Sequence, residues 1–195
     1  MGTMEELKLY SVSDTYIKYL RRIFTNVYSN KESERIHTRK YVGVVIRLEK
    51  YNYYIPMSSP KESDYQIAGH KRKIKKSIVP IIRMIAQNKN GEKELIGTLR
   101  ISHMIPAPES ELKLYDVAGE TDHAYRNLVQ NQIIFIRKNR EKILANAKLI
   151  YKQKIENDLS AGYVKAALEY PGLEKLCDRF VQEKNGGNGR NESCL

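Results

Sequence analysis

The sequence predicts an α+β fold, a small antiparallel barrel with helices packed around it. Extended, β-branched patterns separated by turns occupy much of the first half, between Tyr41 and Ile101. After Asp122 the apolar residues recur at the three- and four-residue spacing of an α-helix. Since strands come first and helices later, the two kinds of element are expected to segregate as in α+β proteins.

The first elements are predicted to be a helix and a β-hairpin. A helix over residues 13–28 is favoured because Ser13 or Asp14 can cap it and one face gathers apolar side chains: Tyr16, Ile17, Leu20, Ile23, Phe24 and Val27. Residues 29–40 are polar and predict a loop, and residues 41–48 and 53–57 predict the hairpin. Gly43 in mid-strand predicts a bulge or a close backbone approach. Pro56 predicts that the second strand lies at an edge or ends there.

The rest of the chain is predicted to hold two more long strands and then only helices. Residues 78–86 and 94–101 predict strands joined by a turn at 88–91, and 112–117 a short extended piece. Helices are expected over 122–140, 141–156, 160–169 and 171–184, the second continuing the first with a bend. A single domain is predicted over 4–184. Residues 1–3 are predicted to be a vector remnant and 185–195 a disordered tail.

Composition points to a polyanionic partner. The 195-residue chain has a formal net charge of +11, which favours nucleic acid first and an acidic membrane surface second. It has neither an apolar run approaching the roughly 18 residues that span a bilayer nor a leader, so a cytoplasmic location is expected. The two cysteines and four scattered histidines predict no metal site, although His70 and His103 are candidate general acids or bases. The absence of a P-loop and of GxGxxG argues against NTPases and dehydrogenases, and no cofactor is expected.

The tetrapeptide Ser58-Ser59-Pro60-Lys61 is the strongest candidate for chemistry. Pro60 fixes the backbone after a strand, so the two hydroxyls before it lie on a rigid corner. A hydroxyl can bind a non-bridging phosphate oxygen, and the Lys61 ammonium can offset charge in a phosphorane-like transition state. Such a group suits cleavage in which the 2′-hydroxyl of RNA attacks the adjacent phosphorus. The alternative is an ordinary surface turn.

Two further patterns favour RNA binding, each with a structural alternative. Five cations in six residues, with Ile74 as the only break, are typical of phosphate-binding segments or of a solvated loop: Lys71, Arg72, Lys73, Lys75 and Lys76. The chain has 14 tyrosines, of which Tyr51, Tyr53 and Tyr54 cluster near the serines. They could provide stacking platforms for bases or fill a half-buried sheet.

The order and spacing of several motifs resemble one family. They are LYSVS at 9–13, RKYVGVV at 39–45, YIPMSSPK at 54–61, MIP at 104–106 and the helical segment 128–139. Across roughly residues 7–145 this string is similar to the toxins of type III toxin–antitoxin systems, the ToxN, AbiQ and CptN group of endoribonucleases. The CptN branch is the most similar.

The resemblance implies an SH3-like barrel of the Kid/MazF type, elaborated with helices. It implies a metal-independent, sequence-specific endoribonuclease toxin that leaves a 2′,3′-cyclic phosphate and serves phage defence by abortive infection or plasmid maintenance. A repeated pseudoknot antitoxin RNA would inhibit the toxin, be cut by it into units, and alternate with it in a closed ring. The essential serine falls on Ser59 and its neighbour on Ser58, the motif lysine on Lys61, a basic side chain on Arg39 beside Lys40, and an RNA-groove tyrosine on Tyr10.

The general base stays open at this point, because a serine hydroxyl is a poor base at its ordinary pKa and Lys61 would have to be neutral for part of the cycle. The main alternative function is a non-catalytic RNA-binding module that uses the same basic surface. A DNA-binding regulator is less favoured, because no helix-turn-helix pattern with a short glycine turn occurs.

Overall fold

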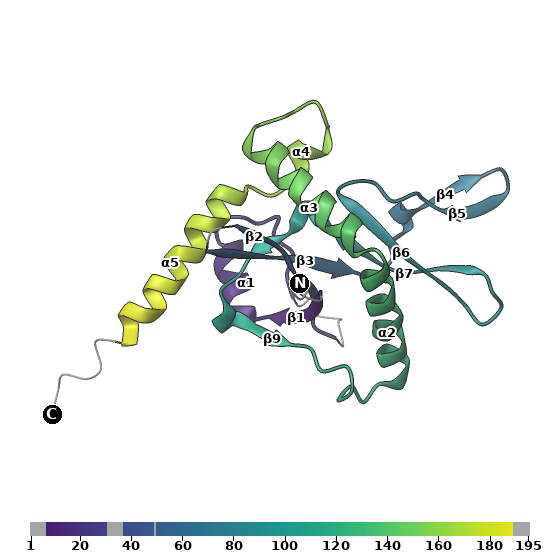
Figure 1. The fold of residues 1–195 in the computed structure, drawn as a ribbon, viewed down its shortest axis with the longest axis horizontal. Coiled ribbons are helices and arrows are strands. Elements are labelled where there is room, and N and C mark those ends of the chain that lie inside the picture. Colours follow the sequence, from purple (N-terminus) through teal and green to yellow (C-terminus); the bar gives the residue numbers. More distant parts are fainter. Residues whose placement is uncertain (1–6, 31–36, 49, 189–195) are drawn as a thin grey trace, which may run out of the picture.

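The computed structural model describes residues 7–30, 37–48 and 50–188, and its fold is α+β, as predicted (Figure 1). The strands are β1 Lys8–Val12, β2 Tyr41–Leu48, β3 Tyr51–Ser58, β4 Tyr65–Ala68, β5 Lys71–Ile74, β6 Ile81–Gln87, β7 Lys93–Arg100, β8 Ile105–Pro106 and β9 Leu112–Leu114. The α-helices are α1 Asp14–Arg21, α2 His123–Lys138, α3 Arg140–Ile155, α4 Tyr163–Ala166 and α5 Tyr170–Asn188. Short 3-10 helices are η1 Glu62–Asp64, η2 Ile101–His103 and η3 Glu109–Glu111.

The main sheet is antiparallel and open. Its strand order is β6-β7-β3-β2-β1-β9, and β8 is an additional partner of β3. The end strands β6 and β9 do not pair with each other, so the described strands do not form the closed barrel that the sequence predicted. β9 is only three residues long and pairs with β1 alone, which leaves too short an edge to complete a barrel.

β3 lies inside the sheet, where the sequence predicted an edge or an end. One side pairs with β2 along its length, and the other pairs first with β8, through Tyr53 and Tyr54, and then with β7, through Met57 and Ser58. Pro56 falls where β3 changes from one neighbour to the other. The proline's missing N–H is therefore tolerated in a central strand, and the prediction was wrong for this local reason.

Gly43 fulfils both expectations placed on it. The register between β2 and β3 shifts between Gly43 and Ile46, as at a β-bulge. A Cβ atom added at Gly43 would lie 2.1 Å from Cδ1 of Tyr54, a buried ring of the core. The glycine thus lets this tyrosine pack flat against β2.

α1 is shorter than the helix predicted over 13–28. Its cap is Ser13, whose hydroxyl accepts a hydrogen bond from the Tyr16 N–H. The helix ends at Arg21, and turns over residues 22–27 bury Val27 but leave Ile23 60% exposed. Apolar spacing of three and four residues suits successive turns as well as a helix, which explains the overextended prediction.

Helices pack around the sheet and the core between them is rich in tyrosine. α2 contacts β6 and β7, α3 contacts β2 and η2, and α5 contacts β8 and α1. The bend predicted near 140 is a break at Asn139, which ends α2 and precedes α3. Glu174 of α5 accepts hydrogen bonds from the hydroxyls of Tyr53 and Tyr151, at 2.6 and 2.9 Å. Burial and the Glu174 carboxylate raise the pKa of Tyr53.

α5 continues to Asn188, so it includes the first residues of the segment expected to be a tail from 185. The remaining tail residues and residues 1–3 lie outside the described part of the chain. None of the described helices is long and apolar enough to cross a membrane.

Candidate active site

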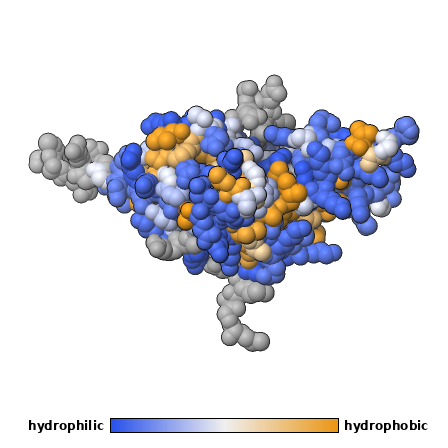
Figure 2. Space-filling model, turned by 90° about the horizontal axis from the view of Figure 1, so that it is seen from above, coloured by the Kyte–Doolittle hydropathy of each residue, from blue (hydrophilic) through white to orange (hydrophobic). Residues whose placement is uncertain are grey.

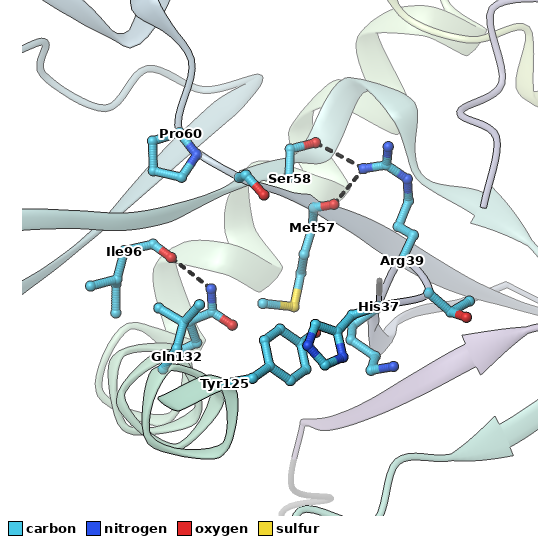
Figure 3. A pocket seen from close by; sticks show the side chains of 12 residues that line it. His37, Arg39, Met57, Ser58, Pro60, Ile96, Tyr125 and Gln132 are labelled. Atoms are coloured by element: carbon cyan, nitrogen blue, oxygen red, sulfur yellow. Dashed lines mark hydrogen bonds between the residues drawn. The ribbon is translucent and has the colours of Figure 1, made fainter. Parts of the chain in front are cut away.

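A cavity of about 360 Å³ lies where β3 ends. Its walls come from three parts of the chain: segment 37–40 before β2, segment 57–60 at the end of β3, and α2, with Ile96 of β7 completing the lining (Figure 3). The sheet explains this convergence, because β3 pairs with β2 on one side and with β7 on the other. Of the predicted catalytic residues, Arg39, Lys40, Ser58 and Ser59 line this cavity.

Arg39 is held in one orientation by several groups. Its Nη1 donates to the Met57 carbonyl at 2.5 Å and to the Ser58 hydroxyl at 2.9 Å (Figure 3), and its Nε donates to the Ser29 carbonyl at 3.2 Å. The guanidinium also lies 4.8 Å from the centre of the Tyr28 ring, a cation–π contact. Only 6% of Arg39 is exposed. Because the Ser58 oxygen accepts from Arg39, its own hydroxyl proton can donate to another group.

Lys40 is half-buried, with its Nζ 4.3 Å from the centre of the Tyr115 ring. Its backbone carbonyl accepts from the Met57 N–H at 2.9 Å, which ties segment 37–40 to β3. Burial lowers the pKa of the Lys40 ammonium, and the nearby Glu120 carboxylate opposes this effect in part. A lysine with a lowered pKa can exchange protons closer to neutral pH than an exposed one.

Ser59 and Lys61 differ in their relation to the cavity. Ser59 lines it and is exposed, so its hydroxyl is accessible to a bound molecule. Lys61 is exposed but does not line the cavity. Its backbone forms the turn into η1: the Lys61 N–H donates to Asp64 Oδ2 at 3.0 Å, and its carbonyl accepts from the Asp64 N–H at 2.9 Å.

Asp64, which the sequence analysis did not single out, is fully buried beneath this turn. Arg100 Nη2 lies 3.4 Å from Asp64 Oδ2, and Arg83 Nη2 lies 3.1 Å from Oδ1 without hydrogen-bond geometry. The Asp64 carbonyl also accepts from the Lys75 N–H at 2.9 Å. Asp64 therefore joins the turn at Lys61, through its carboxylate, to the basic segment, through its backbone carbonyl. The sequence feature that could have drawn attention to Asp64 is its position as the last acidic residue before the acid-free stretch 65–91.

The predicted basic tract forms part of a two-stranded hairpin, β4–β5, and not a loop. This hairpin extends away from the sheet (Figure 1), and the end of the molecule that carries it is largely hydrophilic (Figure 2). Lys71, Arg72 and Lys73 are exposed, but Arg72 already pairs with Glu62 at 2.7 Å. None of the tract lines the cavity.

Of the tyrosines predicted as RNA contacts, Tyr53 and Tyr54 lie inside the protein, and Tyr10 and Tyr51 are half-buried. Tyr53 and Tyr54 are at most 2% exposed, and the half-buried Tyr51 donates to Asp178 at 2.7 Å. Tyr10 on β1 packs edge-on against Tyr54, with 5.4 Å between ring centres, and does not line the cavity. For the Tyr51–Tyr54 cluster the sheet-filling interpretation is the correct one.

The cavity also contains an aromatic pair that the sequence analysis missed. The His37 and Tyr125 rings stack with centres 3.6 Å apart and planes 4° apart. His37 Nε2 lies 3.4 Å from Oδ2 of Asp122, which also caps α2 through the backbone N–H groups of Ala124 and Tyr125. These N–H bonds, together with His37, lower the pKa of Asp122. The sequence predicted only a loop over 29–40, because only the tertiary structure brings His37 against α2.

The two candidate histidines lie apart from the cavity. His103 stacks on Tyr28 at 4.5 Å, and burial, with Arg100 and Arg39 adding to the effect, lowers the His103 pKa to about 4. It is therefore neutral at pH 7. His70 is exposed at the turn between β4 and β5. Within the described ranges, no three His, Cys, Asp or Glu side chains gather as metal ligands would.

Comparisons with known proteins agree on one family. The family model described as Toxin ToxN, type III toxin–antitoxin system, matches residues 8–178. The chain is 25% identical to the endoribonuclease ToxN of Bacillus thuringiensis subsp. kurstaki, covering 93% of this chain and 88% of that protein. It is 29% identical to the endoribonuclease AbiQ of Lactococcus lactis subsp. lactis, covering 86% of each.

Solved structures give the same picture. A type III toxin structure, from work on selective toxin inhibition by a non-coding RNA pseudoknot, is 26% identical with a TM-score of 0.70. The structure of AbiQ, a lactococcal anti-phage endoribonuclease, is also 26% identical with a TM-score of 0.73. Each comparison covers 91% of this chain and 99% of the other.

Proposed function

The chain belongs to the ToxN family of toxins from type III toxin–antitoxin systems, and on that premise we propose that it is an endoribonuclease whose active site is the cavity at the end of β3. One observation carries this proposal. A buried arginine fixed by two backbone carbonyls donates to the Ser58 hydroxyl beside the accessible Ser59. Cationic and hydroxyl donors thus converge on one small volume, as stabilisation of a phosphorane-like transition state requires.

The reaction is an internal transesterification. The 2′-oxygen of the substrate ribose bonds to phosphorus while the bond from phosphorus to the 5′-oxygen breaks. The 2′-hydroxyl loses a proton and the 5′-oxygen gains one, which gives a 2′,3′-cyclic phosphate and a 5′-hydroxyl end. Ser58 and Ser59 donate to the non-bridging oxygens, and Arg39 and Lys61 offset the added charge. Lys40 lines the cavity and has a lowered pKa, so it is a better candidate for proton transfer than Lys61, which does not line the cavity.

The proposed partner is RNA in two roles, as substrate and as inhibitor. The relative that is inhibited by a non-coding RNA pseudoknot supports inhibition of this toxin by a repeated pseudoknot RNA. The toxin is further proposed to cut this RNA into units and to alternate with them in a closed ring. The exposed cations of β5, together with Lys75 and Lys76, would bind phosphates beyond the cut site.

The proposed biological use of the protein is phage defence by abortive infection. The open sheet of the protein is proposed to be a variant of the SH3-like, Kid/MazF-type barrel. The observation that supports this is that one edge of β3 pairs with two different neighbours, β8 and β7.

The test compares the protein with Ser59→Ala on a mixed-sequence RNA in EDTA, followed by analysis of the new ends. Discrete cuts with 2′,3′-cyclic phosphate ends are expected from the parent protein and not from Ser59→Ala. Ser63→Ala is the matched control, since Ser63 is an exposed serine of the same turn and should cut normally. RNA retention without cutting by any of the three proteins would favour the alternative, a non-catalytic RNA-binding module.

A further inference from the structure

The wall of the cavity opposite segment 37–40 has the character of a small-molecule site. Tyr125, Leu128 and Gln132 are spaced three and four residues apart, so they share one face of α2. Met57 and Ile96 complete an apolar lining. The volume of about 360 Å³ falls in the range of about 300–1,000 Å³ that is typical of ligand pockets. A planar ring of nucleobase size fits such a space.

One polar group in this wall is fixed in a single orientation. Gln132 is 8% exposed, and its Nε2 donates to the Ile96 carbonyl at 2.6 Å. Because only the amide nitrogen can donate to a carbonyl, this bond fixes which end of the Gln132 amide is the oxygen. Oε1 therefore faces the cavity as an acceptor (Figure 3).

Gly97, with φ of +151°, makes this arrangement sterically possible. A Cβ atom there would lie 2.9 Å from Gln132 Nε2, so a larger residue would displace the amide.

Where segment 37–40 meets α2, the cavity offers an aromatic surface. His37 and Tyr125 are stacked on each other and both line the cavity, and His37 retains 28% exposure of its side chain. Flat rings of this kind are the usual partners of unstacked bases in single-stranded RNA. Ser58 and Ser59, the proposed phosphate contacts, line the same cavity. A base bound here would therefore belong to a nucleotide next to the scissile phosphate.

We propose that this cavity is a nucleobase subsite that selects a base with an exocyclic amino group, with Gln132 Oε1 as the acceptor. The inference rests on the proposed function, because it takes the ligand to be the substrate RNA. Adenine, cytosine and guanine each offer such an amino group, whereas uracil presents carbonyl oxygens that would face the Gln132 oxygen. Gln132 thus determines specificity without taking part in bond cleavage.

The experiment measures binding and needs no cleavage. Ser59→Ala protein is titrated with labelled single-stranded oligomers of adenosine and of purine riboside, which lacks only the amino group. We expect the adenosine oligomer to bind about three- to tenfold more tightly, as one hydrogen bond to a fixed acceptor predicts. Adding Gln132→Met should bring this ratio close to one. Adding Gln130→Met instead, on an exposed face of α2, should leave the ratio unchanged.

The outcomes separate this inference from the proposed function. A ratio near one in the Ser59→Ala protein, or an unchanged ratio after Gln132→Met, overturns the subsite. A ratio that depends on Gln132, found together with a parent protein that does not cut RNA in the cleavage test above, supports the subsite and removes the endoribonuclease proposal. If Gln132→Met does not fold cooperatively, Leu128→Phe replaces it. This change fills the cavity from the next turn and must abolish the same ratio.

Discussion

Arg39 is the residue on which the geometry of the site depends most. Its guanidinium bonds three separate groups, the carbonyls of Ser29 and Met57 and the hydroxyl of Ser58. A lysine ammonium is a compact point charge on a flexible stem and cannot reproduce this planar fork. The sequence indicated a basic residue here, but only the packing of segment 37–40 against β3 defines its bonds.

Arg39→Lys is expected to lower kcat for RNA cleavage by about 10²-fold, because the fixed donor that orients the Ser58 hydroxyl toward the phosphate is removed. KM should change little, since the charge is kept. Single-turnover cleavage assays measure the effect, and Arg47→Lys on the exposed face of β2 is the matched control. Equal rates for Arg39→Lys and the parent protein would contradict the role given to Arg39.

Asp64 is expected to stabilise the fold through its two buried arginine partners. Asp64→Asn leaves Arg83 and Arg100 as uncompensated buried charges, so the free energy of unfolding should fall by about 3–5 kcal/mol. Glu62→Gln removes only the exposed pair with Arg72 and should cost less than about 1 kcal/mol. Urea denaturation of both variants tests this contrast. Similar losses for the two would mean that the buried cluster contributes little.

His103 should make the protein acid-sensitive. Its folded pKa of about 4 lies below the ordinary value of 6.5, so the unfolded chain binds more protons between these two values. The stability that is linked to this lowered pKa of His103 is fully present above about pH 6.5 and is lost as the pH falls toward 4. His103→Gln should reduce the loss of stability between pH 7 and pH 5, measured by denaturation at each pH. His70→Gln, at an exposed turn, should show the parent's pH dependence.

At the scale of elements, the β4–β5 hairpin lies apart from the cavity and is proposed to contact RNA phosphates beyond the cut site. Its alternation directs Lys71 and Lys73 to one face and Arg72, already paired with Glu62, to the other. The sequence predicted that this basic tract binds RNA phosphates, which stays a prediction. It did not predict the strands, because charged side chains interrupt the apolar alternation on which a strand prediction depends.

Lys71→Ala with Lys73→Ala should weaken RNA binding and reduce the slope of log K against log salt by about 1.4, which is about 0.7 for each RNA phosphate that is no longer neutralised. Binding measured at several salt concentrations, in the Ser59→Ala background, gives the slope. The control pair Lys142→Ala and Lys148→Ala, on exposed positions of α3, should change the slope less. An unchanged slope in the hairpin variant would remove this hairpin from the RNA interface.

At the scale of the whole molecule, the arrangement of the sheet decides where the site lies. β3 carries the serines to the point where β2, β7 and α2 approach one another, so a single cavity gathers residues from 37 to 132. If toxin and antitoxin RNA alternate in a closed ring, the complex should contain equal numbers of protein chains and RNA units. Light scattering on the purified complex measures this ratio, and an excess of either component would contradict the ring.

The sequence by itself determined the α+β class, the bulge at Gly43, the positions along the chain of the long strands, and the serine corner with its basic neighbours. These features depend on local patterns, such as residue type, spacing and turn chemistry, which a single chain displays directly. Only the tertiary structure decided that β3 is central, that the sheet stays open, and that Asp64, His37 and Gln132 lie where they do. Each of these depends on contacts between segments distant in the chain, and no local pattern records which of the many available partners a segment will meet.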